Sequence, residues 1–160
     1  MKGIRIGQGF DVHKLIPGRD FWLGGIIIPH HSGALGHSDA DVLIHVICDA
    51  LLGAANLRDI GYHFPDNDPK YKEIDSKILL KEVVALVRQT GYNIGNVDAT
   101  VCLQSPKISK YIPDMVQCLA NVMELEENQV SIKATTTERL GFVGREEGVS
   151  ALAVALIFRA

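Results

Sequence analysis

"SDADVLIHVICDALLGAA", residues 38–55, carries the strongest helix signal in the chain. Ser38, followed three residues later by Asp41, is typical of an N-cap and an acidic first turn, which predicts a helix over residues 40–55. Its positions other than Asp41, His45 and Asp49 are almost wholly apolar, and a helix of that composition is mostly buried. The sequence therefore predicts that this helix belongs to the core.

Strand and helix signals on both sides of this segment predict an α+β fold. We expect strands over residues 3–10, 21–23, 26–28, 94–104, 130–134 and 149–158, and further helices over residues 76–90 and 109–124. Gly24-Gly25 predicts a tight hairpin turn, residues 33–39 a turn, and residues 56–74 a long connection that is functional or mobile. The order of elements predicts one domain, residues 1–160, with helices packed on one face of a mixed four-stranded sheet plus a small β-hairpin.

The composition argues against several classes of protein. A net charge of −3 without a Lys/Arg block argues against nucleic acid or an anionic membrane as a partner. The longest apolar runs, such as residues 149–158, are well short of the roughly 20 residues of a membrane helix, and no signal peptide is recognisable. The three widely spaced cysteines, Cys48, Cys102 and Cys118, predict buried reduced thiols in a cytoplasmic protein.

Asp11 and His13 lie two positions apart after a run that predicts a strand. Side chains at i and i+2 of a strand leave the same face, so this carboxylate and imidazole point the same way. The pair is either an ordinary strand end or part of a metal site. Together with His45 from the helix, it would supply the three protein ligands of a zinc site that keeps one position open.

The polar line on the helix also has two explanations. Asp41, His45 and Asp49 are spaced i, i+4, i+8 and therefore share one side of the helix. The line is either a solvent-exposed stripe, or it presents His45 as a ligand while Asp41 or Asp49 accepts the hydrogen of the other imidazole nitrogen. A stripe without Lys, Arg or Glu is less typical of a solvated face.

Two further segments offer groups suited to phosphate. "KATTTERLGFVGREEG", residues 133–148, combines threonine hydroxyls, Glu138 and Arg145, although a threonine-rich turn with charged flanks explains it equally well. In "GHSDAD", residues 36–41, His37 and Ser38 precede a helix N-terminus, which favours an anion. Without any of the common nucleotide-binding or hydrolase motifs, the residues point to metal-assisted phosphoryl chemistry on a small molecule.

Five segments together carry a family resemblance over essentially the whole chain. They are "GFDVH" (9–13), "HSDADVLIH" (37–45), "DIGYHFPDND" (59–68), "QSPK" (104–107) and "KATTTERLGFVGREEG" (133–148). In this order the segments resemble the 2-C-methyl-D-erythritol 2,4-cyclodiphosphate synthase family. The resemblance implies a homotrimer with active sites between subunits, and a phosphorus–oxygen lyase of the non-mevalonate isoprenoid pathway. The implied reaction converts the nucleotide-linked diphosphate 4-diphosphocytidyl-2-C-methyl-D-erythritol 2-phosphate into the cyclic diphosphate and CMP.

The resemblance also implies roles for individual residues. The zinc ligands would be Asp11, His13 and His45, and a second divalent ion, Mg²⁺ or Mn²⁺, would lie beside Glu138. His37 and Thr136 would stabilise the transition state. The implied substrate-binding residues are Asp11, Val12, His13, His37, Ser38, Asp59, Ile60, Gly61, Phe64, Pro65, Asp66, Asn67, Asp68, Leu103, Gln104, Ser105, Pro106, Lys107, Ile108, Ser109, Thr135, Thr136, Thr137, Glu138, Phe142 and Arg145.

Two other functions compete with this one. A zinc phosphohydrolase would attack a nucleotide with a metal-bound hydroxide and so incorporate solvent oxygen into linear products. A trimeric ligand-binding module of similar fold would catalyse nothing and would need no tightly bound zinc.

Overall fold

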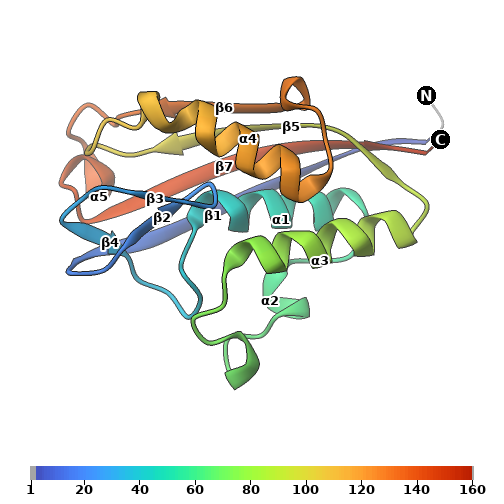
Figure 1. Ribbon diagram of the computed structural model, residues 1–160, viewed down its shortest axis with the longest axis horizontal. Coiled ribbons are helices and arrows are strands. Elements are labelled where there is room, and N and C mark those ends of the chain that lie inside the picture. The colour runs from blue at the N-terminus through green and yellow to red at the C-terminus, as the bar shows by residue number, and fades with distance from the viewer. Residues whose placement is uncertain (1–2, 160) are drawn as a thin grey trace.

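The computed structural model describes residues 3–159 (Figure 1). The elements in chain order are β1 (Ile4–Pro17), β2 (Phe21–Leu23), β3 (Ile26–Ile28), β4 (Ser32–Ala34), α1 (Val42–Ala54), α2 (Ile60–His63), the 3₁₀ turn η1 (Pro69–Tyr71), α3 (Ser76–Gln89), β5 (Asn93–Cys102), η2 (Ser109–Tyr111), α4 (Ile112–Met123), η3 (Glu127–Gln129), β6 (Val130–Thr135), α5 (Gly141–Gly144) and β7 (Gly148–Phe158). Within residues 3–159, no helix has both the length and the apolar composition needed to cross a membrane.

The main sheet is mixed and has five strands in the order β4-β1-β7-β5-β6. β7 pairs antiparallel with β1 and β5, and β6 joins β5 in parallel. The helices α1, α3 and α4 lie on one face of this sheet (Figure 1), which confirms the predicted α+β architecture, and β2 and β3 form the predicted hairpin. The expected count of four strands is wrong. The extra strand is β4, three residues long and too short to show an alternating pattern, which pairs with the end of β1.

The helix α1 begins later than the sequence predicts, because Asp41 and not Ser38 is its N-cap. The Asp41 carboxylate accepts hydrogen bonds from the backbone N–H groups of Leu43 and Ile44 at 3.1 and 3.0 Å. It also accepts bonds from Gly24 and Gly25 in the hairpin turn at 3.0 and 2.7 Å. Asp41 is fully buried, and this burial raises its pKa although the N–H bonds oppose the shift. The carboxylate therefore joins the hairpin to α1 and is no part of a solvent-exposed stripe.

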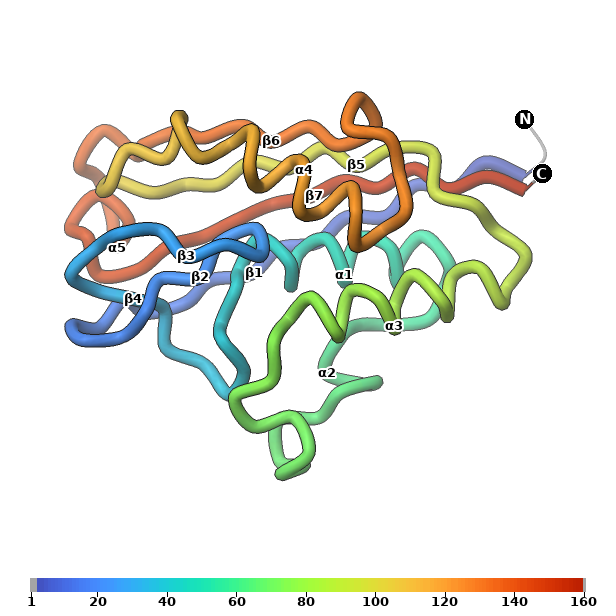
Figure 2. The backbone as a smooth tube through the Cα atoms, viewed as in Figure 1, coloured from blue at the N-terminus to red at the C-terminus, as the bar shows by residue number. Residues whose placement is uncertain are grey.

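Two glycines in β1 let α1 lie directly against the sheet. A Cβ at Gly7 would come within 2.0 Å of the Ala50 carbonyl oxygen, and a Cβ at Gly9 within 2.0 Å of the Val46 carbonyl oxygen. The backbones of strand and helix therefore touch where any other residue would hold them apart. The other side of α1 packs against α3, and the segment between these two helices projects away from the sheet (Figure 2).

The face of the sheet opposite the helices carries several exposed apolar side chains. On β1, Ile6 is 67% and Phe10 is 58% exposed, and on β7 Leu152 and Val154 are also exposed. In the described part of the chain no helix covers this face (Figure 1). Exposed apolar side chains gathered on one sheet face are typical of an interface between protein chains.

All three cysteines are free. Cys48 is buried in α1, and its burial raises its pKa well above the usual thiol value. Cys102 and Cys118 are only half-buried, so the prediction of buried thiols is correct for Cys48 alone.

Candidate active site

Asp11, His13 and His45 come together as the sequence predicts. Asp11 and His13 follow Gly9 on the face of β1 that carries α1, and His45 comes from the first turns of α1. The Nε2 atom of His13 lies 3.0 Å from Nδ1 of His45, and one Asp11 carboxylate oxygen lies 3.2 and 3.1 Å from these two nitrogens. The three side chains are half-buried and form a group able to hold a metal ion.

The donor atoms fit a divalent cation in both chemistry and spacing. Two imidazole nitrogens and one carboxylate oxygen are a set that zinc and similar ions accept. Zinc bonds of about 2.0–2.1 Å at tetrahedral angles place neighbouring ligand atoms about 3.3 Å apart, close to the three separations observed. Burial raises the pKa of Asp11, but its hydrogen bonds to His13 and His45 and their charges outweigh this, so the pKa lies well below its usual value. Asp11 therefore keeps its negative charge.

The second nitrogen of His45 does not meet either carboxylate expected from the helix. Its Nε2 atom lies 3.1 Å from the hydroxyl of Ser38 and 3.2 Å from the hydroxyl of Ser76. Asp41 is engaged with the backbone, and Asp49 accepts a hydrogen bond from the Ile60 N–H at 2.8 Å. The expectation that Asp41 or Asp49 binds this imidazole is therefore wrong, because both carboxylates bind backbone N–H groups and the serine hydroxyls lie beside Nε2 instead.

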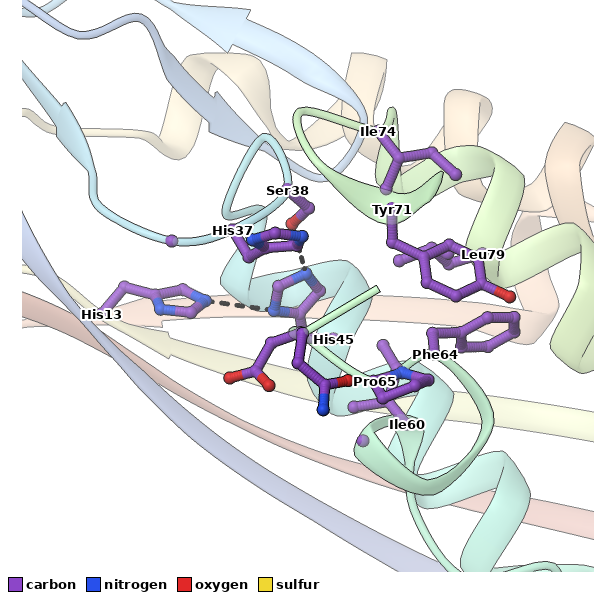
Figure 3. Close-up of a pocket in the computed structure, with 14 residues that line it drawn as sticks. His13, His37, Ser38, His45, Ile60, Phe64, Pro65, Tyr71, Ile74 and Leu79 are labelled. Carbon is purple, nitrogen blue, oxygen red and sulfur yellow. Dashed lines mark hydrogen bonds between the residues drawn. The ribbon is translucent and has the colours of Figure 1, made fainter. Parts of the chain in front are cut away.

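A cavity of about 490 Å³ opens beside these residues (Figure 3). His13, His37, Ser38 and His45 line one end of it. Of the residues implied by the resemblance, Ile60, Gly61, Phe64, Pro65, Asp66 and Asn67 also line it. Three apolar lining residues, Tyr71, Ile74 and Leu79, were not anticipated. In the sequence these residues look like ordinary core positions, so no local signal distinguishes them from residues of the core.

Two of the implied residues from this region act on the backbone. Asp59 is the N-cap of α2 and accepts a hydrogen bond from the Tyr62 N–H at 2.9 Å. Asp68 caps η1 in the same way through the Lys70 N–H, also at 2.9 Å. These carboxylates therefore fix the shape of the loop that forms one wall of the cavity.

Most of the remaining implied residues line a second cavity, of about 280 Å³. Its lining comes from the segment after β5 and from the end of the parallel strand β6, namely Leu103, Gln104, Pro106, Lys107, Ile108, Ser109, Ala134, Thr135 and Thr136. Next to it, the Arg139 N–H donates to the Gln104 side-chain oxygen at 3.1 Å, and the Thr136 hydroxyl donates to Glu138 at 3.3 Å. This cavity shares no lining residue with the first. Within one chain, the metal-binding group and the threonine-rich loop therefore belong to separate cavities.

The last implied residues are exposed. Phe142 is 41% exposed, and Arg145 forms a two-bond ion pair with Glu147 at 3.0 Å for each bond. Val12 lies 43% exposed on β1, on the face away from α1. An exposed ion pair contributes little to stability, so Arg145 can exchange its partner for an anionic ligand.

Known proteins match the chain over its full length. The YgbB family model matches residues 4–158. The 2-C-methyl-D-erythritol 2,4-cyclodiphosphate synthase of Bacteroides fragilis is 64% identical over 156 residues, which cover 98% of each chain. Among solved structures, a CDP complex of IspF from Plasmodium falciparum has a TM-score of 0.87 at 36% identity, over 99% of this chain and 98% of that one. The bifunctional IspDF of Campylobacter jejuni has a TM-score of 0.95 at 42% identity, over 98% of this chain and 42% of that longer one.

Proposed function

This chain belongs to the YgbB family of 2-C-methyl-D-erythritol 2,4-cyclodiphosphate synthases, and we propose that it converts 4-diphosphocytidyl-2-C-methyl-D-erythritol 2-phosphate into 2-C-methyl-D-erythritol 2,4-cyclodiphosphate and CMP. This is a step of the non-mevalonate isoprenoid pathway. The observation that carries the proposal is the group Asp11, His13 and His45, whose donor atoms converge at the end of a cavity large enough for a phosphorylated sugar alcohol.

The reaction is an internal displacement that needs positioning more than proton transfer. An oxygen of the substrate's 2-phosphate attacks the β-phosphorus, the bond from that phosphorus to the bridging oxygen breaks, and CMP leaves with the electron pair. Because the attacking phosphate is already anionic, no protein base is required. The residues of the chain therefore act by orienting the two phosphates and by neutralising their charge.

Asp11, His13 and His45 would hold zinc, and Glu138 would hold a second ion, Mg²⁺ or Mn²⁺. When bound, such ions neutralise phosphate oxygens and make the β-phosphorus more electrophilic. His37 and Thr136 would stabilise the charge that develops in the transition state. His37 fits this role because it lines the cavity beside His45, and Thr136 fits because its hydroxyl lies beside Glu138.

The two cavities divide the substrate between them. Residues 59–61 and 64–68 would contact the ribose and the methylerythritol unit at the first cavity. The second cavity, with residues 103–109 and 135–138, would hold cytidine and the diphosphate, with Phe142 and Arg145 at its edge. The Plasmodium falciparum relative was solved as a CDP complex, which supports a cytidine nucleotide as the ligand.

The separation of the cavities supports a homotrimer with active sites between subunits. In the proposed assembly, the second cavity of one copy would lie next to the first cavity of a neighbouring copy, so that one substrate contacts both. The exposed apolar face with Ile6, Phe10, Leu152 and Val154 offers the surface on which copies would meet. Burial of these side chains would stabilise the assembly by about 25 cal/mol for each Å² of apolar surface removed from water.

The test is turnover in water labelled with ¹⁸O. The zinc-loaded protein is incubated with the diphosphocytidyl substrate, and the products are followed by ³¹P NMR and mass spectrometry. We expect a cyclic diphosphate and CMP without solvent oxygen. Linear products that carry ¹⁸O would show a phosphohydrolase instead, and a protein that binds the substrate without turnover would be a binding module.

A further inference from the structure

The Nε2 atom of His45 lies within hydrogen-bond distance of two buried hydroxyls. The oxygen atoms of Ser38 and Ser76 are 3.1 and 3.2 Å away. Ser76 is the first residue of α3 and is fully buried, while Ser38 is 7% exposed. The contact between Ser76 and His45 joins residues 31 positions apart and has no part in the backbone of either helix.

The direction of these hydrogen bonds follows from the partners of Ser76. Its hydroxyl donates to one carboxylate oxygen of Asp39, and its backbone N–H donates to the other at 2.9 Å. A hydroxyl has one hydrogen, so the Ser76 oxygen can only accept from His45. A hydrogen on Nε2 of His45 therefore finds an acceptor in the Ser76 oxygen, and in that tautomer the lone pair of Nδ1 faces His13 and the Asp11 carboxylate, where a cation would bind.

We propose that Asp39 and Ser76 are positioning residues that select the tautomer and orientation of His45 in which Nδ1 is free to bind a cation. The role rests on the proposed metal site. A carboxylate behind a metal-binding histidine is a common arrangement, because it fixes the ring and raises its basicity. Here the serine hydroxyl stands between the carboxylate and the ring, so Asp39 acts on His45 through Ser76.

The segment that carries Asp39 is itself hydrogen-bonded to the residues just before α3. The Asp39 N–H donates to the Ile74 carbonyl at 3.1 Å, and the Glu73 N–H donates to the His37 carbonyl at 2.7 Å. These bonds keep the carboxylate over the first turn of α3, where Ser76 is. A purely structural role, in which Asp39 only fixes the start of α3, is the alternative that an experiment has to exclude.

The test compares Ser76→Ala with Asp75→Ala. Asp75 is the N-cap of the same helix and accepts a hydrogen bond from the Lys77 N–H at 2.9 Å, and its side chain has no contact with His45 among the described residues. Both variants lose a polar contact at the same helix end. Zinc affinity is measured by competition with a chelator, and the tautomer of His45 is read from ¹⁵N NMR of the metal-free protein.

We expect Ser76→Ala to weaken zinc binding by about 10- to 100-fold and to lose the uniform Nε2–H tautomer, while Asp75→Ala keeps the affinity and tautomer of the parent chain. Asp39→Asn, which retains the shape of the side chain, should show a smaller loss of the same kind. It keeps the test decisive if Ser76→Ala fails to fold. Parent-like zinc affinity and tautomer in a folded Ser76→Ala or Asp39→Asn variant would overturn the proposal. The NMR measurement needs neither zinc nor substrate, so it still tests the roles of Asp39 and Ser76 if the proposed function proves wrong.

Discussion

Gly9→Ala tests whether the contact between β1 and α1 sets both the stability of the fold and the geometry of the metal-binding group. The added Cβ would lie 2.0 Å from the Val46 carbonyl oxygen and 2.8 Å from its carbonyl carbon, whereas ordinary contact begins at 3.4 Å. The atoms in the way are backbone, so no side chain can rotate to make room. The helix would have to move away from the strand by about 1 Å or more at Val46, the residue after His45.

The size of this shift predicts two effects. Overpacking of a close-packed interface typically costs about 1–3 kcal/mol, so we expect the free energy of unfolding of the metal-free protein to fall by that amount. Metal–ligand distances tolerate deviations of about 0.2 Å, and the expected displacement of His45 is several times larger. We therefore expect zinc affinity to fall at least tenfold, which corresponds to about 1.4 kcal/mol.

The assays are urea unfolding of the metal-free protein and chelator competition for zinc. Gly53→Ala is the matched control, because Gly53 is an exposed glycine of the same helix with no atom nearer than 4.0 Å to an added Cβ. Alanine favours helix over glycine by about 1 kcal/mol, so the control should be as stable as the parent or more so, with unchanged zinc affinity. A folded Gly9→Ala protein with parent-like zinc affinity would refute the role assigned to this contact.

His45→Ala should abolish zinc binding and cyclisation, while its circular dichroism spectrum stays that of the folded protein. The control His31→Ala, at an exposed position, should retain zinc binding and cyclisation. Full turnover by the His45→Ala variant would contradict the assignment of His45 as a ligand. Asp41→Ala should lower the free energy of unfolding by about 2 kcal/mol or more, because four backbone N–H groups lose their acceptor; a urea transition unchanged from the parent argues against this role. Phe10→Glu should dissociate the proposed trimer in sedimentation experiments. The control Ile27→Glu, at an exposed position of the hairpin, should leave the trimer assembled. A Phe10→Glu protein that is still a trimer would place the interface elsewhere.

The sequence predicts those elements whose signals are local. The hairpin around Gly24-Gly25 and the helix that ends before Gly91 lie where the pattern places them, because turn and cap residues act within a few positions. The strand β4 has no such signal, since its three residues are paired only because β1 continues to Pro17. The cap of α1 was misplaced because Ser38 and Asp41 can both cap a helix. The hairpin N–H groups that bind Asp41 decide between them, and this partnership is tertiary.

The candidate site shows the same division. The strand period places Asp11 and His13 on one face, and the helix carries His45, but nothing in either pattern measures the distance between the strand and the helix. Gly9 makes that distance small, but this role can be recognised only once the structure places the Val46 backbone opposite Gly9. Ser76 was missed because it reaches His45 across 31 residues, and no spacing rule connects the start of one helix with the middle of another.

The geometry of the group Asp11, His13 and His45 therefore depends on two separate contacts, and mutation can test each of them alone. From the β1 side, Gly9 fixes where the helix lies, so its replacement should lower stability and zinc affinity together. From the α3 side, Ser76 fixes how the imidazole is turned within that frame, so its replacement should lower affinity beyond what a matched loss of helix capping explains. Because the chain buries a large hydrophobic core, the cation does not have to order it. Small zinc domains, which fold only with their metal, are the opposite case. In the proposed reaction, the free energy of metal binding would thus hold and polarise phosphate rather than fold the protein.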